Sequence, residues 1–269
     1  VNVEKTYHPL EPNEEILGKD TVIALDTEFV SIRQSEIEVN ADGELETIRP
    51  TVYALARISI IRGSGEKEGL PFIDDYIATK DPVVDYLTSY SGIIKEDLDP
   101  KFSKRNLVPL KIAYKKLWIL LNLGCKFLGH GLRQDFRVAN IYVPKSQVID
   151  TSDFFFITTL KRKLSLAFLA WFFLQEKIQV ITHDSIEDAR TALKLYRKYQ
   201  EFKHAGIFDI MLQNIYRKGK DTGFKPPPAK DDRNFIKRTE TPPLANETII
   251  PITPTRRIED SHLLDSSSS

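Results

Sequence analysis

Short apolar runs, separated by polar segments and turn residues, follow one another over roughly the first 220 residues of the chain. Five of these runs have the length and composition of β-strands: 21–31, 52–61, 70–76, 126–129 and 147–150. Apolar residues at helical spacing predict helices over 82–89, 106–123, 164–174 and 185–200, with a further helix near Gln134. Because three strands come first and strands then alternate with helices, we predict an α/β fold in which helices flank a mixed β-sheet.

The composition of the chain divides it at residues 20 and 220. A polar, acidic lead-in covers 1–20, and the predicted α/β domain covers 21–220. Within the domain, 31–50 is a polar connection with a turn at Ala41-Asp42-Gly43. Proline and serine are concentrated in 221–269, where apolar periodicity is weak, so we predict a disordered tail or, alternatively, an interaction segment. The chain does not begin with methionine, and we expect it to be cut from a longer protein.

Charge and cysteine content narrow the function classes. The 38 Lys and Arg residues balance 38 Asp and Glu residues, so there is no overall basic field to attract nucleic acid. Bound divalent cations can still neutralise phosphate locally. The single cysteine, Cys125, excludes an internal disulfide and a cysteine-rich zinc site, and we expect it to be a buried thiol. The longest apolar run is far shorter than the ~20 residues of a membrane span, so we expect a soluble intracellular domain and no membrane partner.

Two acidic residues, Asp26 and Glu28, interrupt the apolar strand VIALDTEFV. Side chains two positions apart on a strand project from the same face. Buried neighbouring carboxylates repel each other and need a cation between them, and their hard oxygen atoms suit Mg²⁺ or Mn²⁺. The alternative is an edge strand on which both side chains face solvent as ordinary surface charge. The acidic pair by itself favours that alternative.

A third carboxylate, Asp135, follows a glycine turn in the stretch GHGLRQDFR. Gly129 and Gly131 allow the chain to turn sharply from the strand 126–129 into the next helix. An acidic side chain in the first turn of a helix is also favoured by the helix dipole. Asp135 alone is therefore equally well explained as a helix-start charge, and we assign no catalytic role to His130 in the same turn.

The segment THDSIEDA predicts the start of another helix. Asp184 and Glu187 have the spacing of a capping box, with aspartate in place of Ser or Thr. Asp188 lies four residues before Ala192 and so belongs to the apolar, buried stripe of that helix. His183 falls just before the helix, where it can point at the same site. The alternative for His183 is a capping or packing histidine.

These pieces occur in a defined order along the chain. An acidic pair on the first strand is followed by an aspartate after a glycine turn, and then by a histidine five residues before a last aspartate at a helix start. This order resembles the three-motif pattern of the DEDD 3′→5′ exonucleases, in the subclass with histidine in the third motif. The resemblance implies a ribonuclease-H-like fold and hydrolysis that uses two divalent metal ions, Mg²⁺ or alternatively Mn²⁺.

The resemblance also implies a role for each matching residue. Asp26 bridges the two metals, while Glu28 and Asp188 hold the metal that binds the attacking water. Asp135 supports the second metal, and His183 takes the proton from the attacking water. An imidazole whose pKa is near neutrality suits a general base at cellular pH. All five positions match the family pattern, so the resemblance implies an active nuclease.

Six stretches between residues 18 and 218 extend the resemblance: ALDTEFVSI, GLPFIDDYI, VVDYLTSYSGI, FLGHGLRQDFRV, FLAWFFL and THDSIEDARTALKLYRKY. Together they look like the exonuclease domain of the poly(A)-nuclease deadenylases. That family implies shortening of messenger-RNA poly(A) tails in the cytoplasm, with release of 5′-AMP. The implied partners are single-stranded RNA with a 3′ poly(A) end, a kinase-like regulatory subunit and poly(A)-binding protein. Phe29 and Leu132 lie beside the carboxylates in the motifs and are candidates to contact the terminal nucleotides; for either residue a core side chain is the alternative.

Two rival interpretations stay open. A general DEDD exonuclease acting on short RNA or single-stranded DNA would share the carboxylates and differ in its substrate. An inactive RNA- or protein-binding module on an exonuclease fold would lack turnover, and its expected mark in the sequence is a lost metal ligand. None of the predicted ligand positions has lost its carboxylate.

Overall fold

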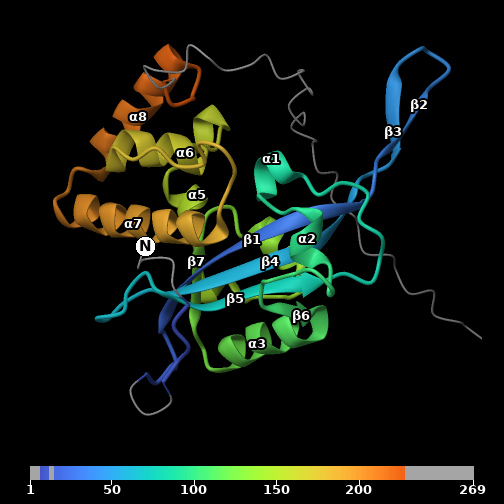
Figure 1. Cartoon of the computed structure of the whole chain (residues 1–269). Coiled ribbons are helices and arrows are strands. Elements are labelled where there is room, and N and C mark those ends of the chain that lie inside the picture. The colour runs from blue at the N-terminus through green and yellow to red at the C-terminus, as the bar shows by residue number, and fades with distance from the viewer. Residues whose placement is uncertain (1–6, 12–14, 228–269) are drawn as a thin grey trace, which may run out of the picture. The chain divides into compact units, whose positions relative to one another are not determined.

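A computed structural model of the chain describes residues 7–11 and 15–227 (Figure 1). At its centre is a six-stranded sheet with the strand order β6-β5-β4-β1-β7-β8. The strands are β1 (Val22–Arg33), β4 (Val52–Arg62), β5 (Pro71–Ala78), β6 (Leu107–Pro109), β7 (Lys126–Gly129) and β8 (Val148–Asp150). The β1–β4 and β4–β5 pairs are antiparallel, whereas the β1–β7, β7–β8 and β5–β6 pairs are parallel. The sheet is therefore mixed, as the sequence predicts.

Helices cover both faces of this sheet (Figure 1). The helices are α1 (Thr88–Ser91), α2 (Lys95–Leu98), α3 (Leu110–Asn122), α4 (Arg133–Val138), α5 (Thr151–Phe154), α6 (Leu166–Leu169), α7 (Ser185–His204) and α8 (Phe208–Thr222). The single turns η2 (Lys145–Gln147) and η3 (Thr158–Leu160) are 3-10 helices, and η4 (Ala170–Leu174) is a π-helical continuation of α6. Helices α5 to α8 gather on one face of the sheet and α3 lies on the other (Figure 1). The predicted layers of sheet and helices are confirmed.

The two faces of β1 enter different hydrophobic cores. Ile23 and Leu25 pack in the core that also contains Leu117 of α3, whereas Ala24 packs with Ala189 of α7. Cys125 is fully buried in the α3 core, as expected, and burial raises the pKa of its thiol. Since side chains alternate along a strand, the positions two and four after Ala24 also face α7. The acidic pair on β1 therefore points toward α7.

The predicted helix over 82–89 is wrong. The segment before Thr88 is extended, because it pairs with the end of β1: the Ser31 N–H donates to Asp85 O at 2.8 Å, and the Val84 N–H donates to Ser31 O at 2.8 Å. Ser31 is in register with Tyr53 of β4, and this pairing satisfies its backbone groups on the other edge of β1, where β7 pairs only with Val22–Ala24. The helix α1 then begins only at Thr88.

The predicted helices over 106–123 and 164–174 are partly correct. In the first, β6 precedes α3 and pairs with β5, so the segment adds an edge strand before it turns helical at Pro109. Proline has no N–H to donate, and an edge position tolerates that. In the second, Ser165 caps α6 by accepting from the Phe168 N–H at 3.3 Å, so the helix begins at Leu166.

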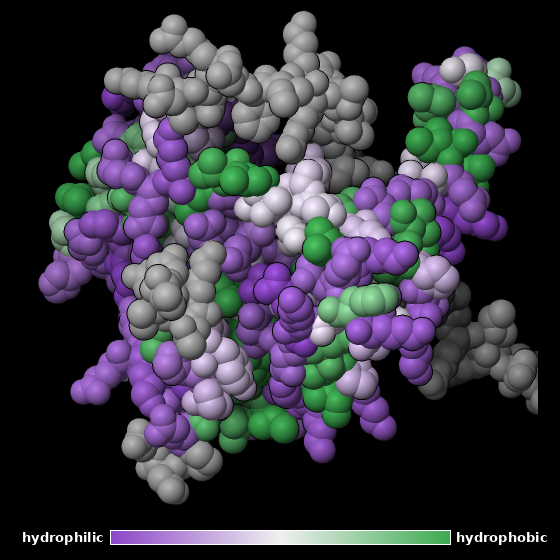
Figure 2. Space-filling model, in the orientation of Figure 1, coloured by the Kyte–Doolittle hydropathy of each residue, from purple (hydrophilic) through white to green (hydrophobic). Residues whose placement is uncertain are grey.

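A two-stranded hairpin, β2 (Glu36–Val39) and β3 (Leu45–Arg49), projects from the end of β1 and was not predicted (Figure 1). The predicted turn is present at its tip, where Gly43 has a φ of 81°. Every residue of both strands is exposed, and hydrophobic side chains are visible on the hairpin surface in Figure 2. Glu36–Val39 alternates polar and apolar residues, which is the signal that could have predicted β2, although neither face of the hairpin is buried.

The ends of the domain are described only in part. Helix α8 was not predicted as a separate element, and it runs to Thr222. Most of the predicted tail, 228–269, lies outside the described residues, and the divisions at residues 20 and 220 stay predictions. Over the residues that the structure covers, none of the helices combines the length and the apolar character needed to span a membrane.

Candidate active site

Apolar side chains give way to polar ones halfway along the sheet face that α7 covers. In the β1–β4 register, Ala24 opposes Ile61, Asp26 opposes Ser59, and Glu28 opposes Arg57. The Ser59 hydroxyl lies 2.7 Å from the hydroxyl of Ser185, the first residue of α7. The N-terminus of α7 therefore lies over the polar half of this face.

Three of the predicted carboxylates are deeply buried. Glu28 is 5% exposed, Asp135 7% and Asp188 4%, while Asp26 is partly buried. Strand β1 lies between β4 and β7 in the sheet. The alternative of an edge strand whose acidic pair faces solvent is therefore wrong.

The structure brings the four carboxylates close enough to influence one another electrostatically. Burial, reinforced by the charges of Asp135, Asp188 and Glu28, raises the pKa of Asp26 well above its ordinary value. Burial, followed by repulsion from Asp188, raises the pKa of Glu28 to about 9. Burial raises the pKa of Asp188 to about 7 and that of Asp135 to about 6. Such mutual repulsion in a buried site makes a bound cation favourable.

Asp135 reaches this site because β7 ends in a tight glycine turn. Gly131 has a φ of 81°, and α4 begins two residues later. Asp135 lies in the first turn of α4, as predicted, and accepts a hydrogen bond from the hydroxyl of Thr27 on β1. A side chain added at Gly129 would collide with Leu132 and with the backbone of β1, so that position requires glycine.

Asp150, which the sequence analysis did not single out, holds the glycine turn in place. Its Oδ1 accepts from the Gly131 N–H at 2.8 Å, and its Oδ2 accepts from the Leu132 N–H at 2.9 Å. Asp150 is also the N-cap of α5, through a bond from the Ser152 N–H. An aspartate at the end of a predicted strand is the signal that could have identified this residue.

Asp184 caps the N-terminus of α7, so the His183 side chain is not needed as a cap and is available to the site. The Asp184 Oδ1 accepts from the Ile186 N–H at 3.1 Å, so Asp184 is the N-cap. The Glu187 carboxylate, the second member of the predicted capping box, accepts from the Gln179 N–H through its Oε2 at 3.3 Å. His183 is therefore no cap, and its Nδ1 lies 3.6 Å from the Asp188 Oδ2.

His183 keeps part of its ring accessible. Its side chain is 36% exposed and packs edge-on against Tyr90, with ring centroids 6.2 Å apart. The backbone N–H of His183 donates to the backbone carbonyl oxygen of Tyr90 at 2.9 Å. Burial lowers the pKa of the imidazole, an effect that the charge of Glu187 opposes. A neutral imidazole beside a buried carboxylate is able to accept a proton.

The chemistry of the carboxylates fits divalent metal ions. Glu28 Oε1 and Asp188 Oδ1 are buried and receive no hydrogen bond from the part of the chain that the structure describes. Oxygen atoms left in this way are ligands of the hard type that Mg²⁺ and Mn²⁺ prefer. The side chains are not yet arranged as a ligand set: among the described residues, no three His, Cys, Asp or Glu side chains are placed to hold one ion together.

Gln179 bonds to one of these carboxylates, and it was also not predicted as a site residue. Its Nε2 donates to the Asp188 Oδ2 at 2.8 Å, so the amide occupies an oxygen that a metal ion would use. Gln179 has a φ of 55°, in the left-handed region, and belongs to an irregular segment before α7. Nothing in the local sequence pattern marks it.

The remaining candidates take simpler positions. Leu132 is 1% exposed and packs in the α3 core, and Phe29 is partly buried against the same core, which favours the core alternative for both. Their contact with nucleotides stays a prediction. His130 is a satisfied polar residue, since its ring nitrogens lie 2.9 Å from Thr151 Oγ1 and 3.1 Å from Leu164 O.

Sequence relatives place the chain in a family. Residues 23–196 match the family described as Exonuclease, RNase_T. The PAN2-PAN3 deadenylation complex catalytic subunit PAN2 of Chaetomium globosum is 66% identical over 239 residues, which are 89% of this chain and 22% of that protein. The Neurospora crassa counterpart is 58% identical over 246 residues, 89% of this chain and 19% of that protein. The chain spans about a fifth of the length of these curated relatives.

Solved structures agree with this assignment. The Pan2 catalytic unit of Neurospora crassa, a protease and nuclease domain, superposes with a TM-score of 0.69 at 57% identity, covering 79% of this chain and 32% of that one. The pseudoubiquitin hydrolase-RNA exonuclease module of Saccharomyces cerevisiae Pan2, in complex with A7 RNA, gives a TM-score of 0.75 at 44% identity, covering 83% and 36%. The chain therefore belongs to the exonuclease family and has a ribonuclease-H-like fold.

Proposed function

We propose that this chain is a 3′→5′ exoribonuclease that shortens the poly(A) tails of messenger RNA and releases 5′-AMP. The observation that carries the proposal is the meeting of four acidic side chains, three of them deeply buried, beside the accessible ring of His183. Buried acidic groups of this kind cost folding free energy, and binding of divalent cations offsets that cost.

The proposed mechanism divides the work among these side chains. Asp26, Glu28, Asp135 and Asp188 would hold two divalent ions, Mg²⁺ or alternatively Mn²⁺. When bound, such ions stabilise the charge on the entering and leaving oxygens of an in-line displacement at phosphorus. His183 accepts the proton of the attacking water, because its imidazole is kept neutral by burial and lies at the edge of the acidic site.

Similarity to deadenylases supports the choice of substrate and partners. The relatives are named as catalytic subunits of the PAN2-PAN3 deadenylation complex, and one solved relative is bound to A7 RNA. We therefore propose single-stranded RNA with a 3′ poly(A) end as substrate and a PAN3-like, kinase-like regulatory subunit as partner. Poly(A)-binding protein as a second partner and the cytoplasm as the site of action remain part of the same proposal.

The experiment that tests the proposed function is degradation of 5′-labelled RNA by the whole chain. RNA ending in adenylates should shorten from its 3′ end in Mg²⁺, should release AMP, and should stay intact in EDTA. Shortening should slow at the first residue that is not A.

Two matched substrates distinguish the proposal from its rivals. Equal rates on A-tailed RNA, mixed-sequence RNA and single-stranded DNA would contradict the deadenylase assignment and favour a general exonuclease. A folded chain that binds no Mg²⁺ or Mn²⁺ in calorimetry and degrades no substrate would favour an inactive binding module.

A further inference from the structure

A buried arginine lies among the acidic side chains under α7. Arg57 of β4 is 9% exposed and directly opposes Glu28 of β1. Its Nε donates to the Asp74 Oδ1 at 2.7 Å and its Nη2 donates to the Asp74 Oδ2 at 3.2 Å, which makes a bidentate pair. The face of its guanidinium lies over the ring of Tyr76, at 5.1 Å from the centroid. The position and orientation of this side chain are therefore fixed by β5.

The remaining side of the guanidinium reaches the start of α7. Arg57 Nη1 donates to the Asp184 Oδ1 at 3.1 Å, and the same oxygen accepts from the Ile186 N–H at 3.1 Å. One carboxylate oxygen of the N-cap is thus shared between the helix and the sheet. Arginine is suited to this task because its rigid fork of donors can satisfy two carboxylates at once.

A second contact reinforces the same junction. The Ser59 hydroxyl bonds to the Asp74 Oδ1 at 2.9 Å and lies 2.7 Å from the Ser185 hydroxyl. The first two residues that define the start of α7, Asp184 and Ser185, are therefore both tied to β4. His183 immediately precedes this junction, and Asp188 follows it by about one helical turn.

We propose that Arg57 is a positioning residue for hydrolysis: by bridging Asp74 and Asp184 it fixes the first turn of α7 and thereby places His183 and Asp188 over Asp26 and Glu28. This inference rests on the proposed nuclease function. Arg57 acts through Asp184: its Nε and Nη2 hold Asp74, its Nη1 holds Asp184, and its Cζ lies over the ring of Tyr76. Its contribution is therefore to the geometry of the reacting groups, where a displacement of about 1 Å costs about 10²-fold in rate.

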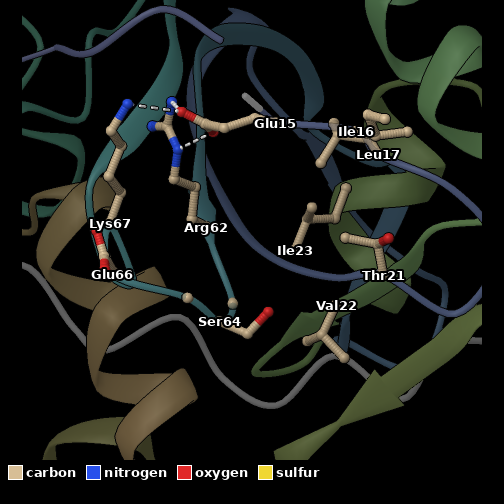
Figure 3. A pocket seen from close by; sticks show the side chains of 12 residues that line it. Glu15, Ile16, Leu17, Thr21, Val22, Ile23, Arg62, Ser64, Glu66 and Lys67 are labelled. Carbon is tan, nitrogen blue, oxygen red and sulfur yellow. Dashed lines mark hydrogen bonds and ion pairs between the residues drawn. The ribbon is translucent and has the colours of Figure 1, made fainter. Parts of the chain in front are cut away.

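The chain offers a matched control for Arg57. Arg62 is also a buried arginine of β4, at 5% exposed, and is also paired with a carboxylate, that of Glu15. In Figure 3 dashed lines join the Glu15 carboxylate to the side chains of Arg62 and Lys67, at a pocket that the lead-in segment helps to line. Arg62 holds the lead-in rather than α7, so its removal tests the general cost of losing a buried ion pair.

The test compares Arg57→Met and Arg57→Lys with Arg62→Met in the whole chain. Both Arg57 variants should lower kcat on A-tailed RNA by about 10²-fold, while KM changes by less than about threefold. Arg57→Lys keeps the charge but lacks the rigid fork that pairs with both oxygens of Asp74 while reaching Asp184, so it should not restore the rate. Arg62→Met should keep kcat within about twofold of the unchanged chain even if its melting temperature falls further.

A double-mutant cycle tests the route through Asp184. Asp184→Asn keeps a good N-cap oxygen but removes the charge that Arg57 contacts. The double variant Arg57→Met with Asp184→Asn should be no more than about threefold slower than either single variant, because both break one interaction. Independent losses that multiply, a near-normal rate for Arg57→Lys, or an equal loss in Arg62→Met would each overturn the proposal.

Hydrogen exchange separates failure of this inference from failure of the proposed function. The Ile186 and Asp188 amides should exchange roughly tenfold faster or more in Arg57→Met than in Arg62→Met. If the unchanged chain hydrolyses nothing, the proposed function fails, and the exchange rates alone then decide the positioning role. Unchanged exchange at these two amides would overturn it.

Discussion

Helix α7 covers two regions of the same sheet face that differ in almost every physical respect. The apolar region consists of Ala24, Ile61 and Leu128 of the sheet against Ala189, Ala192 and Leu195 of α7. The acidic region consists of Asp26, Glu28, Arg57 and Ser59 against Asp184, Ser185 and Asp188. The apolar region stabilises the fold by removing hydrocarbon from water. The acidic region buries mutually repelling charges, and the helix above it is held by the apolar region and by the bonds of Arg57 and Ser59 to Asp184 and Ser185.

Removal of a central carboxylate from the acidic region should have the largest effect on the rate of hydrolysis. Asp26→Asn should lower hydrolysis by at least about 10³-fold, because metal ligation contributes several kcal/mol of transition-state stabilisation and each 1.36 kcal/mol is tenfold in rate. The metal-free variant should be as stable as the unchanged chain or more stable, since repulsion is relieved. Single-turnover kinetics and thermal melting in EDTA measure the two effects. The control is Asp20→Asn, at an exposed aspartate before β1, which should leave the rate unchanged. If Asp26→Asn kept an activity within about tenfold of normal, the metal assignment would be contradicted.

Removal of the imidazole should have the next largest effect on rate. His183→Ala should lower kcat by about 10²–10⁴-fold, the usual worth of a general base. His204→Ala, at the exposed far end of the same helix, should leave kcat unchanged. A negligible loss in His183→Ala would instead leave His183 as a residue that packs against Tyr90.

The apolar region should respond in the opposite way. Leu195 is fully buried, and Leu195→Ala should lower the free energy of unfolding by about 2–5 kcal/mol through lost burial and a residual cavity. Below its unfolding temperature, the variant should keep its kcat. Denaturant titration and initial rates check both expectations, and a large loss of kcat in a fully folded sample would mean that the two regions are not separable.

A change of pH should alter the stability of the protein through the acidic region, without any mutation. The raised pKa values of Glu28, Asp188 and Asp135, about 9, 7 and 6, mean that the folded metal-free protein binds more protons than the unfolded chain above about pH 4. Stability is therefore fully present below about pH 4 and is lost as pH rises through 6 to 9. The melting temperature in EDTA should fall by several degrees from pH 5 to pH 9, at roughly 2–4 °C per kcal/mol. Asp26→Asn should flatten this slope, and a flat profile in the unchanged chain would contradict the burial of repelling carboxylates.

The smallest expected effect concerns the amide that occupies Asp188. Gln179→Ala should raise the affinity for Mn²⁺ by about tenfold, because one hydrogen bond to a charged group, worth about 1.5 kcal/mol, no longer competes for that oxygen. Gln175→Ala is a matched control, since Gln175 also has a left-handed backbone but donates to Phe172 O. Calorimetric titration measures both, and equal affinities in the two variants would contradict the competition.

The strands and helices that could be predicted from the sequence are those that bury one or both of their faces. Strands β1, β4, β5 and β7 are short apolar runs bounded by turn residues, and Asp26 and Glu28 stood out because they break such a run. The hairpin β2–β3 was missed because its short runs, including the alternating Glu36–Val39, lie within a segment that is polar as a whole. The extended segment at Asp85 escaped because its partner, Ser31, is far away in the sequence.

The site residues that were not predicted from the sequence escaped for a common physical reason. Asp150, Gln179 and Arg57 act through bonds to residues 18, 9 and 127 positions away, at Leu132, Asp188 and Asp184. A charged residue inside the apolar run of β4 is a visible signal for Arg57, but its partners depend on the register of three strands and on where α7 begins. Local patterns carry no information about such register.

The exposed hairpin has a consequence for behaviour at high concentration. Among the residues that the structure describes, each strand of this two-stranded sheet keeps one open edge, and Ile37, Val39 and Leu45 lie along one face of it. Such an edge is a template for strand addition between molecules. Glu38 and Glu46 lie side by side on the other face. Because such like charges on two approaching hairpins repel each other, we expect these glutamates to oppose strand addition and to favour colloidal stability, a task unrelated to the chemistry under α7.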